Sequence, residues 1–356
     1  MGVSFNTTHE MLVMAKRNLS HDEWDYINGA AESETSLRRN RQAIDSLAFR
    51  PRILRDVRNI DISTKLLGSH LKMPVVLAPI GGLQRMTKNA ANDVDTAAAA
   101  CGIMNFISTV TDPSIEEVAA NSPHNKVYQI YVRGDDAWIR KLVRRIVKAG
   151  YWGVALTVDS AFYGNRERLH PSLIATRRVA ARDWQKGVTW DTVKLIQDEI
   201  GDMPLFIKGV MTAEDAHLCV EHGVHSVYIS NHGGRQLDHV LGNIETLPEV
   251  IAAVEGKAEV VIDGGFVRGT DIVKALALGA KAVGIGRLQA WALGAGGAEG
   301  LIACLQMLET EILTTMGLVG VKNVAELNPS YITKATPVRL PHEHSAFPHL
   351  PEDRLL

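Results

Sequence analysis

Short apolar runs alternate with longer amphipathic segments along most of the chain. Eight of these runs have the length and the almost continuous apolar character of strands buried on both faces. They occupy residues 73–79, 103–108, 126–132, 153–159, 203–209, 226–230, 259–265 and 282–287. The segments between them carry apolar residues at helical spacing, and several close on a glycine suited to a helix terminus. Examples are residues 135–150, 212–223 and 269–280.

The alternation of predicted strands and helices indicates an α/β protein with a parallel sheet. Eight units over about 240 residues favour a closed (β/α)8 barrel, the TIM barrel, over an open sheet. No GxGxxG sequence opens the first unit, which counts against a dinucleotide-binding fold. We predict a single domain over residues 1–356, with an N-terminal helical cap at 1–70, the barrel at 71–318 and a C-terminal tail at 319–356. The cap should contain two or three helices within residues 7–48.

Polar residues and glycines gather at the ends of the predicted strands, and the carboxyl ends of the strands form the catalytic face of such barrels. These residues are Gly81, Ser108, Thr109, Gln129, Tyr131, Thr157, Asp159, Lys208, Ser230, His232, Asp263, Gly264, Gly265, Gly286 and Arg287. Each has an ordinary structural explanation by itself, such as a turn for His232 or a helix N-cap for Asp159. Their coincidence at one end of one barrel indicates an active site. The glycine-rich turns after the last two strands lie where barrels commonly bind phosphate.

The segment SNHGGRQLD, residues 230–238, carries the densest set of reactive side chains. A buried strand leads into it, and His232 and Arg235 flank two glycines. By itself, this segment could be a turn or the floor of an active site. Lys208 is a further candidate, because a lysine that ends a buried strand needs a partner.

Composition and charge narrow the functional classes. The formal net charge is −2, so nothing favours nucleic acid or an anionic membrane as a partner. Cys101, Cys219 and Cys304 fit no metal-ligand spacing, which predicts reduced thiols and a cytoplasmic location. We expect no secretory signal and no membrane span. We also expect no metal site, including at the histidines within residues 342–349, whose proline-rich tail should wrap the surface or be disordered.

Together these segments resemble the FMN-dependent α-hydroxy acid oxidase and dehydrogenase family, which includes glycolate oxidase, lactate oxidase and mandelate dehydrogenase. The resemblance covers about residues 7–333 and is most specific in SNHGGRQLD, with support from ALTVD, YQIYV, FRPRIL, DGG and KALALGA. It implies FMN as the cofactor and oxidation of an L-2-hydroxy acid to a 2-oxo acid, with hydride passed to flavin N5. It also implies a homo-oligomer, often a tetramer. O2 and other electron acceptors stay open.

The resemblance implies how the substrate is held. Arg235 would bind the substrate carboxylate bidentately, and Tyr26 matches the family's other carboxylate donor. Tyr131 would hydrogen-bond the substrate hydroxyl. Arg166 matches the family's second active-site arginine.

Proton removal and flavin binding would be carried out by strand-end residues. His232 would be the general base, and Asp159 would pair with it and stabilise the imidazolium that forms. Lys208 would lie near flavin N1, where negative charge accumulates on reduction. The set implied to contact FMN, from the ring through the ribityl chain to the phosphate, is Pro79, Ile80, Gly81, Ser108, Gln129, Thr157, Lys208, Ser230, His232, Asp263, Gly264, Gly265, Gly286 and Arg287.

Three features depart from the family pattern. Val267 replaces the first of two adjacent arginines, so that only Arg268 remains, which predicts weaker FMN binding. Val110 replaces an aromatic residue beside the substrate, and the segment 166–208 is shorter than in plant glycolate oxidases, which predicts a roomy, open substrate pocket. Two alternatives stay open: a flavin-free barrel lyase or isomerase that uses Lys208, and a non-catalytic flavin-binding relative.

Overall fold

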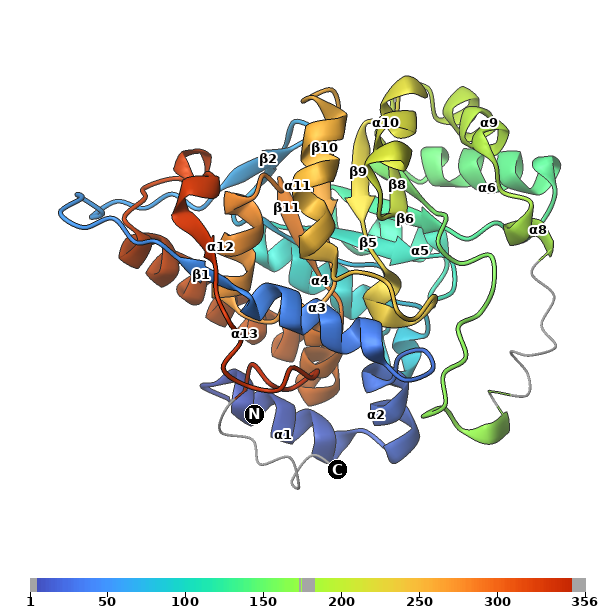
Figure 1. The fold of residues 1–356 in the computed structure, drawn as a ribbon. Coiled ribbons are helices and arrows are strands. Elements are labelled where there is room, and N and C mark those ends of the chain that lie inside the picture. Colours follow the sequence, from blue (N-terminus) through green and yellow to red (C-terminus); the bar gives the residue numbers. More distant parts are fainter. Residues whose placement is uncertain (1–4, 173, 175–182, 348–356) are drawn as a thin grey trace.

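The computed structural model describes residues 5–172, 174 and 183–347, and it confirms the predicted barrel (Figure 1). Parallel strands close into a ring in the order β10-β11-β4-β5-β6-β7-β8-β9. Their bounds are β4 Val75–Leu77, β5 Met104–Ser108, β6 Lys126–Ile130, β7 Gly153–Thr157, β8 Leu205–Val210, β9 Ser226–Ile229, β10 Glu259–Ile262 and β11 Ala282–Ile285. Each strand overlaps one of the eight predicted apolar runs, because strands covered on both faces are apolar almost throughout. Of the tail histidines, His349 lies outside the described residues.

Helices alternate with the strands and surround the barrel. They are α4 Ala91–Cys101, α5 Ile115–Asn121, α6 Asp136–Lys148, α8 Asp183–Lys186, α9 Trp190–Ile200, α10 Ala213–Glu221, α11 Asn243–Val254, α12 Gly269–Ala277 and α13 Arg287–Val319. Helix α6 illustrates how the sequence specifies them. The side chain of Asp135 caps its start by accepting from the backbone N–H of Trp138, and Ile139, Val143 and Ile146 form its buried face.

Three helices precede the barrel, within the segment 7–48 where two or three were expected. They are α1 Thr8–Asn18, α2 His21–Asn28 and α3 Thr35–Asp45. Ser20 and Glu23 start α2 with a reciprocal capping box. Helix α1 packs along α13, and α3 contacts the turn His232–Gly234 that follows β9. The cap therefore reaches the catalytic end of the barrel.

Two small antiparallel sheets, which the sequence pattern did not indicate, complete the fold. Strands β1 Leu47–Phe49 and β12 Ile332–Lys334 pair with each other, as do β2 Thr64–Leu66 and β3 Ser69–Leu71. The first pair joins segments near the two ends of the chain. In the second pair, Leu66 and Leu71 join the buried cluster inside the barrel with Phe106 and Phe206.

Helix α13 is long and apolar enough, by length and composition alone, to cross a membrane, although the sequence runs predicted no span. Its backbone leaves helical geometry at Gly296 and Gly297, so it consists of two helical segments. It packs against α1, α4 and α12, and Trp291, Leu301 and Leu308 are fully buried. These contacts are those of a core helix of the barrel.

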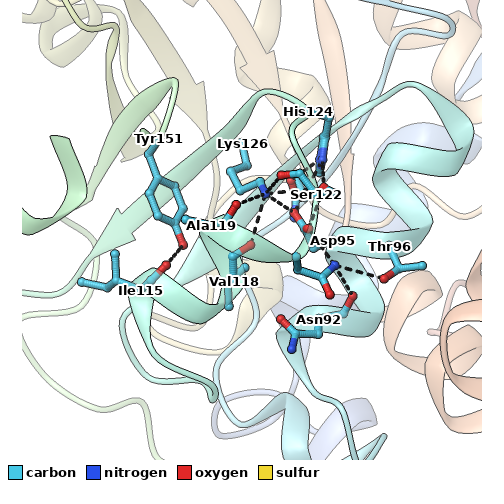
Figure 2. A network of polar contacts seen from close by, with 12 residues as sticks. Asn92, Asp95, Thr96, Ile115, Val118, Ala119, Ser122, His124, Lys126 and Tyr151 are labelled. Carbon is cyan, nitrogen blue, oxygen red and sulfur yellow. Dashed lines mark hydrogen bonds and ion pairs between the residues drawn. The ribbon is translucent and has the colours of Figure 1, made fainter. Parts of the chain in front are cut away.

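A buried polar network lies at the amino ends of β5 and β6, opposite the catalytic end (Figure 2). Lys126 is paired with Asp95 at 2.9 Å and donates to the backbone oxygen of Ser122 at 2.7 Å. The Ser122 hydroxyl donates to the same carboxylate at 2.7 Å, and Nε2 of His124 contacts Asn105 at 2.8 Å. The ion pair is thus surrounded by hydrogen bonds, the condition under which a buried charge is tolerated. This network ties α4, α5 and β6 together.

Candidate active site

A cavity of about 670 Å³ lies at the carboxyl ends of the barrel strands, a size typical of a cofactor or small-molecule site. The predicted site residues on its wall are Tyr26, Pro79, Ile80, Gly81, Tyr131, Arg166, Lys208, His232, Arg235, Asp263, Gly264, Gly265, Gly286 and Arg287. The other predicted residues lie at strand ends outside the wall, and they are Ser108, Gln129, Thr157, Asp159 and Ser230. The barrel topology thus gathers the predicted set at one end.

His232 is held between a carboxylate and a phenol. Its Nδ1 lies 2.9 Å from Oδ1 of Asp159, and its Nε2 lies 3.3 Å from the hydroxyl of Tyr131. The carboxylate favours a proton on Nδ1, which leaves Nε2 as an acceptor. Gly209 on β8 makes room for this pair, because a Cβ at that position would lie 2.7 Å from Cβ of Asp159. No local sequence pattern marks Gly209 for this role.

The electrostatics of this pair favour a neutral imidazole. Burial lowers the pKa of His232, while the Asp159 carboxylate opposes this shift and Lys208 reinforces it. For Asp159, burial disfavours the carboxylate, but His232 and Lys208 together hold its pKa below the ordinary value. At neutral pH the site therefore holds an unprotonated imidazole beside a carboxylate, as a general base requires.

The turn after β9 depends on two glycines. Gly233 and Gly234 have φ of 64° and 75°, and His232 itself has φ of 58°. A Cβ at residue 234 would lie 2.6 Å from the backbone nitrogen of Leu37 in α3, so no side chain fits there. The glycines let the turn approach the cap while His232 and Arg235 reach the cavity wall, as the sequence predicted.

Arg235 joins the barrel to the cap. Its Nη1 donates to the backbone oxygens of Ile27 at 3.2 Å and Gly29 at 2.6 Å, and its guanidinium lies 5.3 Å from the ring centroid of Tyr26. Nε of Arg166 donates to the backbone oxygen of Arg235 at 2.9 Å. The predicted carboxylate-binding residues are thus brought together on the cavity wall.

The residues predicted to face the flavin fit such a group. Nζ of Lys208 donates to the Ser230 hydroxyl at 2.7 Å and lies 3.3 Å from Oδ2 of Asp263. Among the described residues, Nε2 of Gln129, Oγ1 of Thr157 and Oδ1 of Asp263 are buried without a hydrogen-bond partner. Buried polar atoms without partners are uncommon, and a polar ring edge and ribityl chain would supply them. The donor set therefore fits the FMN predicted from sequence.

The part of the cavity predicted to bind the FMN phosphate contains glycines but few cationic side chains. Gly264 and Gly265 have φ of 96° and 89°, which only glycine adopts readily. Val267 lies on the cavity wall where the family pattern has arginine. Arg268 points elsewhere, pairing with Glu311 at 2.6 Å. Neither position of the usual arginine pair contributes a guanidinium to the wall.

Arg287 lines the cavity, but it is engaged with backbone. Its guanidinium donates to the oxygens of Ile27 at 3.1 Å, Gly233 at 3.0 Å and Gly29 at 3.1 Å. Burial, with repulsion from Arg235, lowers its pKa to about 9. Its role at the phosphate stays a prediction.

The tail completes the cavity wall, which the sequence did not indicate. Glu343 lines the cavity and pairs with Arg168 at 3.1 Å. The ring of His344 stacks on Trp24 at a centroid distance of 5.7 Å and lies 5.3 Å from Trp291. Burial lowers the pKa of His344 to about 4, so this ring is neutral at physiological pH.

Gln185 is another residue that sequence reasoning missed. It lies on the cavity wall and accepts from the backbone N–H of Val132 at 2.7 Å. Its amide also donates to the backbone oxygen of Thr157 at 2.8 Å. It thereby ties the segment after β7 to β6 and β7. Its sequence context, RDWQK, carries no catalytic motif, so no local signal marked it.

Comparison with known proteins agrees with this geometry. Residues 15–334 match the sequence model of the FMN-dependent dehydrogenase family. The chain is 36% identical over 355 residues to glycolate oxidase of Spinacia oleracea, covering 93% of this chain and 96% of the relative. It is 35% identical over 349 residues to L-lactate oxidase of Nostoc sp., covering 90% and 95%. The crystal structure of mandelate oxidase superposes with a TM-score of 0.87 at 31% identity, covering 94% of this chain and all of that one.

The chain belongs to the FMN-dependent dehydrogenase family. It is an FMN-dependent enzyme of the class that contains the 2-hydroxy acid oxidases and dehydrogenases. This confirms the predicted cofactor, enzyme class and fold. It also removes the alternative of a flavin-free lyase or isomerase.

Proposed function

We propose that this protein oxidises an L-2-hydroxy acid to the 2-oxo acid, with His232 as the general base. One observation carries the proposal: His232 contacts Asp159 through Nδ1 and Tyr131 through Nε2, and it shares the cavity wall with Arg235. A base, a hydroxyl-binding phenol and a carboxylate-binding guanidinium are the groups that a 2-hydroxy acid requires.

Each residue has a distinct task in this proposal. Arg235 binds the substrate carboxylate bidentately, and Arg166 supports it by donating to its backbone oxygen. Tyr26, whose hydroxyl donates to the backbone oxygen of Gly81 at 2.7 Å, turns to the carboxylate as a second donor when substrate binds. His232 takes a proton at Nε2, and the Asp159 carboxylate stabilises the imidazolium that forms. When bound, FMN supplies the two-electron acceptor.

The substrate side chain is expected to be larger than that of glycolate. Val110 lines the cavity and approaches Gly81, since a Cβ at residue 81 would lie 2.5 Å from Cγ2 of Val110. An aliphatic residue there leaves more space than an aromatic one. Each methylene buried against an apolar wall contributes about 0.8 kcal/mol, so two or three should raise kcat/KM roughly tenfold or more.

Anaerobic flavin reduction by a matched set of acids tests the proposal. Glycolate, lactate, 2-hydroxyoctanoate and mandelate are mixed with the purified flavoprotein, and the loss of flavin absorbance is followed. We expect reduction by the larger acids and slower reduction by glycolate. Failure of all four acids to reduce the flavin would contradict oxidation of 2-hydroxy monocarboxylic acids, and a clear preference for glycolate would contradict the size argument.

The electron acceptor, the location and the assembly state complete the proposal. Admitting air after reduction distinguishes an oxidase, which reoxidises rapidly, from a dehydrogenase that needs another acceptor. A cytoplasmic location is supported by the charge and the free cysteines, which burial keeps protonated by raising each pKa. A homotetramer is supported by the family resemblance.

A further inference from the structure

Arg85 is a cavity-wall cation that the proposed mechanism does not use. It ends the short helical turn Leu83–Arg85 after β4 and is half-buried. Its guanidinium lies 5.1 Å from the ring centroid of Tyr26, the same ring that Arg235 approaches to 5.3 Å. Two guanidinium groups from different strand ends thus meet one aromatic ring in the proposed substrate site.

No carboxylate neutralises Arg85 within the described part of the chain. The acidic residues on the cavity wall are Asp263 and Glu343. Asp263 is paired with Lys208 at 3.3 Å, and Glu343 is paired with Arg168 at 3.1 Å. Arg85 therefore gives its side of the wall an uncompensated positive charge that attracts anions.

A second cation reinforces this charge. Arg133 follows β6, lines the same cavity and forms no ion pair with any residue that the structure describes. Unlike Arg85 it is exposed, so solvent and salt screen it more strongly. Arg85 is consequently the better placed of the two for a specific contact, and Arg133 adds long-range attraction.

The α-carboxylate of the substrate already has its donors in the proposed site, so it leaves few acceptor positions for Arg85. A bidentate guanidinium occupies both oxygens of a carboxylate, and Tyr26 is a further donor to that group in the proposed site. Arg85 also lies close to the space assigned to the substrate side chain, because Gly82 is a neighbour of both Val110 and Arg85. The backbone N–H of Gly82 donates to the oxygen of Val110, and a Cβ added at residue 82 would lie 3.7 Å from Nε of Arg85.

We propose that Arg85 binds a second carboxylate on the substrate side chain, so that the preferred substrates are 2-hydroxy dicarboxylic acids with one or two methylenes between C2 and the distal acid. The inference rests on the proposed function and names its substrate class. The reaction itself is unchanged, since the distal carboxylate is bound and not transformed. Arg85 is a specificity residue, and its contribution falls on binding.

Pairs of acids of equal length test this assignment. (S)-malate is compared with (S)-2-hydroxybutyrate, and (S)-2-hydroxyglutarate with (S)-2-hydroxyvalerate, by anaerobic flavin reduction of the FMN-loaded enzyme. We expect the dicarboxylates to have the higher kcat/KM. Arg85→Gln should lower kcat/KM for the dicarboxylates roughly tenfold or more, the effect of one charge-assisted hydrogen bond, mainly through KM. The same variant should change kcat/KM for the monocarboxylates less than about threefold, since their side chains make no such contact.

The control variant is Lys88→Gln, which removes one positive charge from the same loop at an exposed position outside the cavity wall. In both pairs it should leave the ratio of kcat/KM for the dicarboxylate to kcat/KM for the monocarboxylate unchanged. Arg85→Lys should retain part of the preference for the dicarboxylates. Calorimetric binding of 2-oxoglutarate and 2-oxovalerate provides a readout independent of turnover, and only the former should weaken in Arg85→Gln.

Three results would overturn the assignment. Equal losses on both members of a pair would place Arg85 on the α-carboxylate. No loss on either member would make it a surface residue. A wild-type preference for the monocarboxylates would exclude binding of a distal carboxylate by Arg85. If none of the four acids reduces the flavin, the proposed function fails as well, so the two failures are distinguishable.

Discussion

At the scale of single residues, replacing His232 should impair catalysis without releasing the cofactor. His232→Ala should retain FMN but lower the rate of flavin reduction by about 10² to 10⁴-fold, the range for a positioned general base. Stopped-flow reduction at matched flavin occupancy measures this. His217→Ala, at an exposed histidine on α10, is the matched control. A His232→Ala variant with a near-normal rate would exclude the base assignment.

The pH profile follows from the same residue. Because burial lowers the pKa of His232, the base form persists below the ordinary histidine value of about 6.5. The kcat/KM for flavin reduction should therefore be flat from neutral pH down to that value and fall only at more acidic pH, as the imidazole gains its proton. A profile that already rises through pH 7 to 8 would assign the base to a different group.

Replacing Lys208 should change the redox potential of the bound flavin. Its buried charge lies near the proposed flavin N1, so Lys208→Met should lower the flavin midpoint potential and weaken sulfite addition at N5, since that adduct is anionic. Lys208→Arg keeps the charge next to Asp263 and should retain both properties in part. Spectroelectrochemical titration and sulfite titration provide the values. An unchanged potential at full FMN occupancy would place Lys208 away from the ring.

At the scale of elements, the strands were predictable and the closure of the site was not. Each strand from β4 to β11 is a local apolar run, so burial on both faces is visible in the sequence. Gly209, Gln185 and Glu343 acquire their roles only when β8, the segment after β7 and the tail approach residues distant in sequence. The hydrophobic pattern within one segment carries no information about contacts between segments that are distant in sequence. His232 and Arg235 were predictable because their turn carries its glycines beside them.

The turn between β10 and α12 should limit FMN retention. Val267 lines the cavity and Arg268 is held by Glu311, so this turn contributes no guanidinium to the phosphate end. Val267→Arg should slow FMN loss on dilution into high salt, whereas Val267→Met, of similar length without charge, should not. Recovery of free-flavin fluorescence measures the rate. If wild-type FMN survives prolonged dialysis at high salt, another group supplies the missing charge.

At the scale of the whole molecule, an exposed apolar edge is a candidate interface for the proposed homotetramer. Ile53 and Leu54 lie in the loop between β1 and β2 that projects from the barrel in Figure 1, and they are 81% and 100% exposed. Leu318, at the end of α13, is 74% exposed, and the N–H of Arg52 donates to the oxygen of the adjacent Val319. Large apolar side chains gathered at one exposed edge are typical of an interface.

Leu54→Asp should therefore reduce the assembly state while leaving the barrel folded. Light scattering coupled to size exclusion measures the mass, and circular dichroism checks the fold. Val338→Asp, at a residue that is 98% exposed in the tail, is the matched control and should not change the mass. A wild-type monomer, or a Leu54→Asp variant of unchanged mass, would remove this edge from the interface.

The cavity wall is built from both ends of the chain, since Tyr26 belongs to α2 and Glu343 to the tail. During synthesis Tyr26 leaves the ribosome long before Glu343 does. A nascent chain that already contains every barrel strand still lacks part of the wall. The complete cavity wall can therefore form only once Glu343 has been synthesised, which is later than the completion of the last barrel strand.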